Sequence, residues 1–202
     1  WAPMSEKLVW IDCEMTGLSL ETDAIIEVAA LVTDFELTVL GEGVDILIAP
    51  PAAALGQMND FVRDMHTTSG LLDDLANGVS LQEAQEQVLD YVRAWVPEPR
   101  KAPLGGNTVA TDRGFLARDM AELEAHLHYR IIDVSSIKEL PRRWFPRAYL
   151  AAPAKTGGHR APADLPVPRA ADADGRRQRP GPLGVGLGGG AGGGAGRRVR
   201  PS

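Results

Sequence analysis

Two acidic residues stand two positions apart, directly after an apolar run near the start of this 202-residue chain. Residues 8–11 read Leu-Val-Trp-Ile, which predicts a buried strand, and Asp12 and Glu14 extend it. Because side chains i and i+2 of a strand leave the same face, we expect the two carboxylates to lie side by side. Their mutual repulsion is about 3 kcal/mol at ~5 Å and an effective dielectric constant near 20. The pair therefore needs solvent or a divalent cation between its charges.

A site of the two-metal phosphoryl-transfer type needs three or four carboxylates from separate elements, and a base for the attacking water. Asp112 is a candidate ligand, because the Gly-Gly-Asn-Thr segment 105–108 leads into a helical pattern around it. His159 and Asp164 are further candidates, because two glycines precede another helix-like start there. Histidine titrates near neutral pH, which suits His159 to accept a proton from water. Taken alone, each residue would be assigned as a solvated or helix-terminal group.

The order of these motifs resembles the DEDD exonuclease superfamily, in its histidine-containing branch. A strand-borne Asp-x-Glu, a mid-chain Asp at a helix start and a late His-x4-Asp follow one another here. Within that branch the chain is most similar to the oligoribonuclease family, through segments 10–18, 67–71, 106–107 and 128–130. The resemblance runs over residues 7–164 and implies a ribonuclease H-like fold.

The resemblance also implies an activity, a 3′-to-5′ exoribonuclease that degrades short oligoribonucleotides to nucleoside 5′-monophosphates by two-metal-ion hydrolysis. It implies His159 as the general base, and a homodimer in which Tyr129 acts in the partner's site. Leu18 would wedge against a base, and Ser135 and Lys138 would hold the terminal phosphate. The implied ligands of two Mg²⁺ or Mn²⁺ ions are Asp12, Glu14, Asp112 and Asp164, and the implied substrate contacts are Leu18, His66, Asn107, Thr108, Arg130, Ser135 and Lys138.

Two alternatives stay open from the residues. One is another DEDD-type 3′–5′ exonuclease that acts on longer RNA or DNA ends, although Trp10, Met15 and the His-Tyr-Arg segment argue against it. The other is a catalytically impaired homologue, which Pro162, between the histidine and the last aspartate, supports. Glu27 and His126 have no comparable setting and are expected to be structural.

The elements needed to position these residues follow from the periodicity, which predicts an α/β fold with a mixed five-stranded central sheet flanked by helices. Strands are expected over 7–13, 24–33, 37–49, 103–107 and 130–134. Helices are expected over 60–66, 69–75, 80–96 and 110–127, and from a cap at Ser135 or Ser136 through 144, with Pro141 interrupting or kinking the last. Ser80 and Glu83 form a capping box, and Cys13 should face the packed side of its strand.

Composition separates a folded body from a tail. Residues 166–202 carry 11 of the 22 glycines and a net charge of +5, which leaves −11 for residues 1–165. We predict an exonuclease domain over 1–165 and a disordered Gly/Arg/Pro-rich tail over 166–202, either frameshifted or naturally divergent. An acidic body is poorly suited to binding long nucleic acid.

No apolar run has the length of a membrane span, and the single cysteine excludes an internal disulfide. We therefore expect a cytoplasmic protein.

Overall fold

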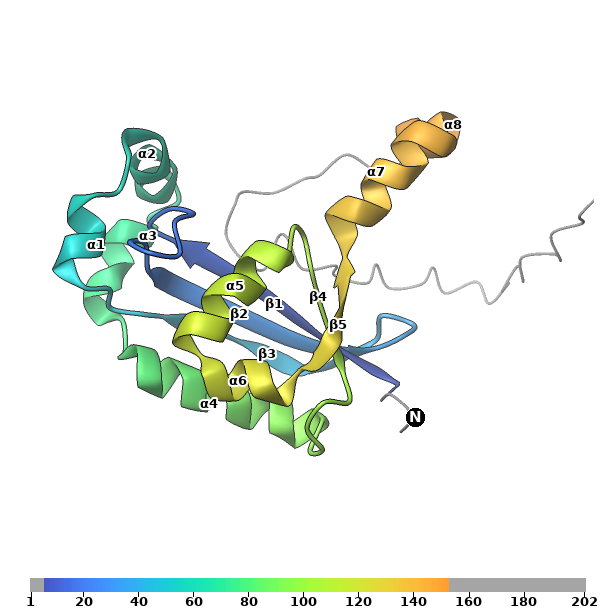
Figure 1. The fold of residues 1–202 in the computed structure, drawn as a ribbon, viewed down its shortest axis with the longest axis horizontal. Helices are drawn as coiled ribbons and strands as arrows, with labels where there is room; N and C mark the ends of the chain where they lie inside the picture. Colours follow the sequence, from blue (N-terminus) through green and yellow to red (C-terminus); the bar gives the residue numbers. More distant parts are fainter. Residues whose placement is uncertain (1–5, 153–202) are drawn as a thin grey trace, which may run out of the picture. The chain divides into compact units, whose positions relative to one another are not determined.

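The computed structural model describes residues 6–152 of the chain (Figure 1). The chain divides into two units, Trp1–Arg169 and Ala170–Ser202, and every described residue belongs to the first. The predicted domain boundary at 165/166 and the predicted tail lie outside the described residues and stay predictions.

One mixed sheet, with strand order β3-β2-β1-β4-β5, forms the centre of the described chain (Figure 1). The antiparallel part consists of β1 (Lys7–Met15), β2 (Ile25–Asp34) and β3 (Val39–Leu47). The short strand β4 (Pro103–Gly106) runs parallel to β1, and β5 (His128–Asp133) runs parallel to β4 at the edge. The predicted α/β class with a mixed five-stranded sheet is therefore confirmed, and β1 is its middle strand.

The helices lie mainly between β3 and β4 and after β4. Before β4 they are α1 (Ala52–Gly56), α2 (Asp60–Thr68), α3 (Leu71–Asp74), the 3₁₀ turn η1 (Leu75–Asn77) and α4 (Leu81–Trp95). After β4 they are α5 (Ala110–Asp119), α6 (Ala121–His126), α7 (Val134–Trp144) and α8 (Pro146–Ala151). The predicted cap of α4 is present, because the Ser80 hydroxyl accepts a hydrogen bond from the Glu83 amide.

The two faces of β1 pack differently. Val9, Ile11 and Cys13 enter the main core, which α4, α5 and α6 cover. Trp10 lies on the opposite face and donates its indole N–H to Thr33 Oγ1 at 2.9 Å. The Trp10 ring fits there because residue 105 is glycine, where an added Cβ would stand 2.6 Å from the ring. Alternation then places Asp12 and Glu14 on the Trp10 face.

Three local expectations were wrong. The helix expected over 110–127 breaks at Met120 into α5 and α6, because Gln85 of α4 accepts the Glu122 amide at 3.0 Å and caps the second helix. Helix α7 ends at Trp144 as expected, but Pro141 does not interrupt it, because this helix is largely exposed and water can bind the carbonyl that the missing proline N–H leaves free. The cap of α7 is Asp133, and neither expected serine. The short helices α1 and α8 were not expected at all.

Candidate active site

The carboxyl end of β1 brings the first two candidate ligands to the surface of the sheet. Asp12 and Glu14 are partly buried, whereas Cys13 between them is only 6% exposed and packs in the core. This confirms the packed position predicted for Cys13. Burial, followed by the charges of Asp112, Asp12 and Glu14, raises the pKa of the Cys13 thiol, so this cysteine stays protonated.

Asp112 joins this pair from a different element. It lies in the first turn of α5, is 6% exposed, and its Oδ1 accepts a hydrogen bond from the Cys13 amide at 3.0 Å. That amide is the one between the Asp12 and Glu14 residues, so the structure brings the three carboxylates to one end of β1. Burial raises the pKa of Asp112 to about 6, although the hydrogen bonds from the backbone amides of Cys13 and of Asp112 itself lower it. A nearby cation would favour the ionised form.

The described residues include part of the candidate metal site. Within residues 6–152, no three His, Cys, Asp or Glu side chains converge closely enough to hold an ion by themselves. Asp164 and His159, the remaining candidate ligand and the candidate base, lie outside the described residues. The donors that are present fit Mg²⁺ or Mn²⁺, because these hard cations prefer carboxylate oxygens.

Glu27 is a carboxylate that the sequence analysis assigned to structure alone. It is 1% exposed and lies in β2 directly opposite Glu14 in the antiparallel register. Directly opposed residues of antiparallel strands share a face, so Glu27 stands beside the candidate ligands. In the sequence, Glu27 stands out as the one polar residue in the apolar run 25–32. Its place beside Glu14 follows only from the register of β1 and β2.

Two candidate substrate contacts flank the end of β1. Leu18 lies in the β1–β2 loop and is 75% exposed. His66 of α2 is buried, and its Nε2 donates to the Met15 carbonyl at 2.9 Å. Burial lowers the pKa of His66, so the ring is neutral at pH 7. His66 therefore ties α2 to the end of β1, while Leu18 is free to meet a ligand.

The loop after β4 and the start of α7 meet at Asp133. This carboxylate accepts the Thr108 amide at 2.8 Å, the Ser135 amide at 3.1 Å and the Ser135 hydroxyl at 2.7 Å, and it also binds the Ser136 hydroxyl. Partial desolvation raises the pKa of Asp133, but the bonds from these groups outweigh it and lower the pKa to about 2. Asn107 is exposed next to Thr108, which has a positive φ of 60°.

Asp133 thus orients Thr108 and Ser135, two of the candidate substrate contacts. We expect Asp133→Ala to lower the free energy of unfolding by about 2 kcal/mol, because the change removes the cap of α7 and leaves the Thr108 amide unsatisfied. Urea denaturation at pH 7 measures this loss. Glu139→Ala, which removes an exposed carboxylate from the same helix, is the control and should leave the midpoint unchanged. Equal midpoints for the two variants would contradict the role of Asp133.

The His-Tyr-Arg segment begins the edge strand β5. Tyr129 is 66% exposed and its ring stacks on His128 with centroids 4.4 Å apart. Arg130 is exposed beside it. Arg113, which no motif indicated, donates to the carbonyls of His128 and Tyr129 at 3.0 and 3.1 Å. Helix α5 therefore carries the candidate ligand Asp112 and also fixes the His-Tyr-Arg segment. Lys138 is exposed on α7, one turn beyond Ser135.

Comparison with known proteins agrees with this geometry. A family model described as Exonuclease (RNase_T) matches residues 9–167, so the class that the fold and the carboxylate strand define is an exonuclease, a hydrolase of phosphodiester bonds. The oligoribonuclease of Streptomyces griseus is 70% identical over 162 residues, which cover 80% of this chain and 81% of that protein. The oligoribonuclease of Cutibacterium acnes is 63% identical over 158 residues, 78% of each chain. The chain belongs to the oligoribonuclease family, which confirms the resemblance seen in the sequence.

Solved structures show the same fold at much lower identity. The zinc-bound E. coli exonuclease I complex with single-stranded DNA superposes with a TM-score of 0.56 at 16% identity, over 70% of this chain and 31% of that one. A product-bound exonuclease I gives a TM-score of 0.54 at 17% identity, over 71% of this chain and 33% of that one. The chain thus spans about a third of these exonucleases, and the likeness concerns the fold alone.

Proposed function

We propose that this chain is a 3′-to-5′ exoribonuclease that hydrolyses short oligoribonucleotides to nucleoside 5′-monophosphates. The observation that carries the proposal is the hydrogen bond from Asp112 to the amide between Asp12 and Glu14, in a chain of the oligoribonuclease family. It places the Asp112 carboxylate at the end of the strand that carries Asp12 and Glu14, where a phosphodiester substrate needs cations. Nucleic acid as the substrate agrees with the exonuclease family model.

Exonucleases of this family use divalent metal ions. The proposed ligands of two Mg²⁺ or Mn²⁺ ions are Asp12, Glu14, Asp112 and Asp164. When bound, such ions activate water and stabilise the leaving 3′ oxygen. His159 takes the proton of the attacking water, for which a neutral imidazole is suited.

The substrate is held by groups around this end of the sheet. The exposed Leu18 packs against a base, and the exposed Asn107 and the Thr108 beside it line the path of the chain. The proposed contacts to the terminal phosphate are Ser135 and Lys138 of α7. Tyr129, Arg130 and His66 complete the proposed set.

A short substrate is expected from the net charge of −11 over residues 1–165. Release of nucleoside monophosphate per 3′ end should be greatest for RNA of about two to five nucleotides and should depend weakly on salt, because few phosphates are contacted. The assay uses a dinucleotide and a ~20-nucleotide strand with Mn²⁺ over a salt series, since a protein that grips many phosphates shows a steep salt slope.

Each other outcome of that assay selects an alternative. Preference for the longer strand, with a steep salt slope, would indicate a DEDD-type exonuclease acting on longer RNA or DNA ends. Absence of product from both substrates would indicate a catalytically impaired homologue.

We propose further that two copies of the chain form a homodimer. The support is an exposed apolar surface along the edge strand and the helices that follow it, comprising Tyr129, Ile131, Ile137, Leu140, Trp144, Phe145, Tyr149 and Leu150. Helices α7 and α8 extend away from the sheet (Figure 1). Exposed apolar side chains on successive elements are typical of interaction sites, and a second copy would also bring its Tyr129 to the neighbouring site.

Trp144→Glu tests the dimer. Trp144 is 66% exposed, and a buried charge at an interface opposes association, so we expect the apparent mass in sedimentation equilibrium to fall to that of one chain. Phe35→Glu, at another half-exposed aromatic residue, is the control and should leave the mass unchanged. A wild-type protein that sediments as a single chain would refute the homodimer.

We place the activity in the cytoplasm, where the protein would meet RNA fragments. No helix within residues 6–152 is long and apolar enough to cross a membrane.

A further inference from the structure

The loop between β1 and β2 presents a leucine close to the candidate ligands. Leu18 is 75% exposed and follows Glu14 by four residues. At the base of the loop, the Thr16 amide donates to the Ala24 carbonyl at 3.0 Å. The position of Leu18 relative to the end of β1 therefore depends on the conformation of residues 17–23.

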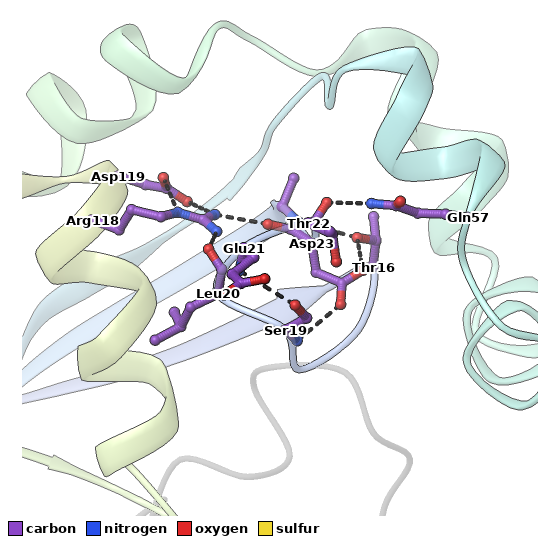
Figure 2. Close-up of polar contacts among 10 residues, drawn as sticks. Thr16, Ser19, Leu20, Glu21, Thr22, Asp23, Gln57, Arg118 and Asp119 are labelled. Atoms are coloured by element: carbon purple, nitrogen blue, oxygen red, sulfur yellow. Dashed lines mark hydrogen bonds and ion pairs between the residues drawn. The ribbon is translucent and has the colours of Figure 1, made fainter.

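Asp23 shapes this loop from within. Its Oδ1 accepts the Thr16 hydroxyl and its Oδ2 accepts the Ser19 amide, both at 2.9 Å (Figure 2). A side chain at residue 17 would displace this carboxylate, because an added Cβ would lie 2.5 Å from Asp23 Oδ2. The carboxylate thus binds the residues on both sides of Leu18.

Arg118 holds the same loop from outside (Figure 2). Its guanidinium donates to the carbonyls of Leu20 and Asp23, the second at 2.8 Å. The Asp119 carboxylate binds the guanidinium, with Nε to Oδ1 at 2.6 Å, and so orients it. Gln57, at the end of α1, donates to the Thr22 carbonyl.

The loop between β1 and β2 is held in place mainly by these hydrogen bonds, because it has little apolar packing beside it. A pocket of about 610 Å³ lies against the loop, lined by residues 20–25, residues 48–51 and Arg118 among others. Segments with few packed apolar neighbours open locally at low free energy unless polar contacts hold them. The loss of Arg118 should therefore loosen the loop without disturbing the core.

Helix α5 connects the loop to the carboxylates. Asp112 lies in its first turn and Arg118 in its last, six residues and about 9 Å further along the helix axis. Asp112 binds the Cys13 amide of β1, and Arg118 binds the loop that follows β1. One rigid helix thus contacts both the strand that carries the candidate ligands and the loop that carries Leu18.

We propose that Arg118, oriented by Asp119, is a positioning residue that sets the location of Leu18 relative to Asp12 and Glu14. Through Leu18 it sets the affinity for the 3′-terminal nucleotides of the substrate. The inference rests on the proposed function, because that function makes Leu18 the residue that contacts a base. Arg118 itself acts only through the loop, so its loss should raise KM and leave kcat nearly unchanged.

A double-mutant cycle on the full chain, with a dinucleotide and Mn²⁺, tests this coupling. We expect Arg118→Met to raise KM roughly fivefold and Leu18→Ala roughly tenfold. The double variant should show no more than the roughly tenfold rise of Leu18→Ala, because Arg118 then has nothing to position. Independent effects that multiply to roughly fiftyfold, or a fall in kcat at constant KM, would overturn the proposal.

Amide hydrogen exchange tests the restraint without any activity. We expect the Ser19 and Asp23 amides to exchange at least roughly tenfold faster in Arg118→Met. Lys7→Met is the matched control. It also removes a hydrogen bond from a cationic side chain to a backbone carbonyl, here Lys7 Nζ to Trp95 O at 2.6 Å, but at the opposite end of β1. Its loop amides should exchange at the wild-type rate.

The two measurements separate the two hypotheses. Unchanged loop exchange in Arg118→Met overturns the positioning role, whether or not the protein is active. A wild-type protein that releases no monophosphate overturns the proposed function, and faster exchange in Arg118→Met alone would then still support the restraint of the loop.

Discussion

Replacing Asp12, Glu14 or Asp112 with alanine should abolish release of nucleoside monophosphate, by at least roughly 10³-fold, because substitutions of residues that only support metal ligands already cost roughly 10–100-fold. The expectation follows from the bond between the Asp112 carboxylate and the Cys13 amide, which places Asp112 at the end of the strand that carries Asp12 and Glu14. Initial rates on a dinucleotide at saturating Mn²⁺ provide the measurement. A chelator should have the same effect, and added Mn²⁺ should reverse it.

The folded state should survive each of these changes. Asp12 and Glu14 are partly exposed, and removal of like charges from one strand end relieves repulsion. The melting temperatures of Asp12→Ala and Glu14→Ala in chelator should therefore equal or exceed that of the wild type. An Asp112→Ala protein with undiminished activity would show that this carboxylate is not a ligand.

The second large effect is a gain in stability when the charge of Asp112 is removed. Asp112 has a pKa of about 6 in the folded chain, above the value of about 3.9 for an unfolded aspartate. The folded state therefore binds more protons than the unfolded state between about pH 4 and pH 6, and the free energy of unfolding falls as the pH rises through that window. Two pH units correspond to at most about 3 kcal/mol.

Asp112→Asn removes this cost and keeps an oxygen that can accept the Cys13 amide. In chelator at pH 8 we expect the variant to unfold at higher urea concentration than the wild type, by a free energy of up to about 3 kcal/mol. The gap should close near pH 4, where the wild-type carboxyl is protonated. A variant that is less stable than the wild type at pH 8 would contradict the desolvation of this carboxylate.

Two comparisons sharpen the result. Asp133 has a lowered pKa, so its carboxylate stabilises the fold at pH 8 and Asp133→Asn should be less stable than the wild type there. Added Mn²⁺ should stabilise the wild type and not Asp112→Asn, because an ion that binds only the folded state adds its binding free energy to stability. The Asp112 carboxylate would then bind the ion in the active protein and lower the stability of the metal-free fold.

The sequence by itself determined the local parts of the site. Strand alternation placed Asp12 and Glu14 on one face and Cys13 on the other, since a period of two is a property of any extended chain. The Ser80 cap and the candidate Asp112 at a helix start also depend on neighbours within one or two turns. Motif order was enough for the oligoribonuclease family, because the spacing of such residues along the chain is itself the signal.

Only the tertiary structure decided which of these residues meet. The bond from Asp112 to the Cys13 amide spans 99 positions, and the bond from Arg118 to the Asp23 carbonyl spans 95. Glu27 became a neighbour of Glu14 only through the register of β1 and β2, and the helix expected over 110–127 broke where Gln85 caps α6. The physical reason is common to all four. Local propensity depends on adjacent residues, whereas strand register and helix docking depend on the burial of the whole core, which no single segment encodes.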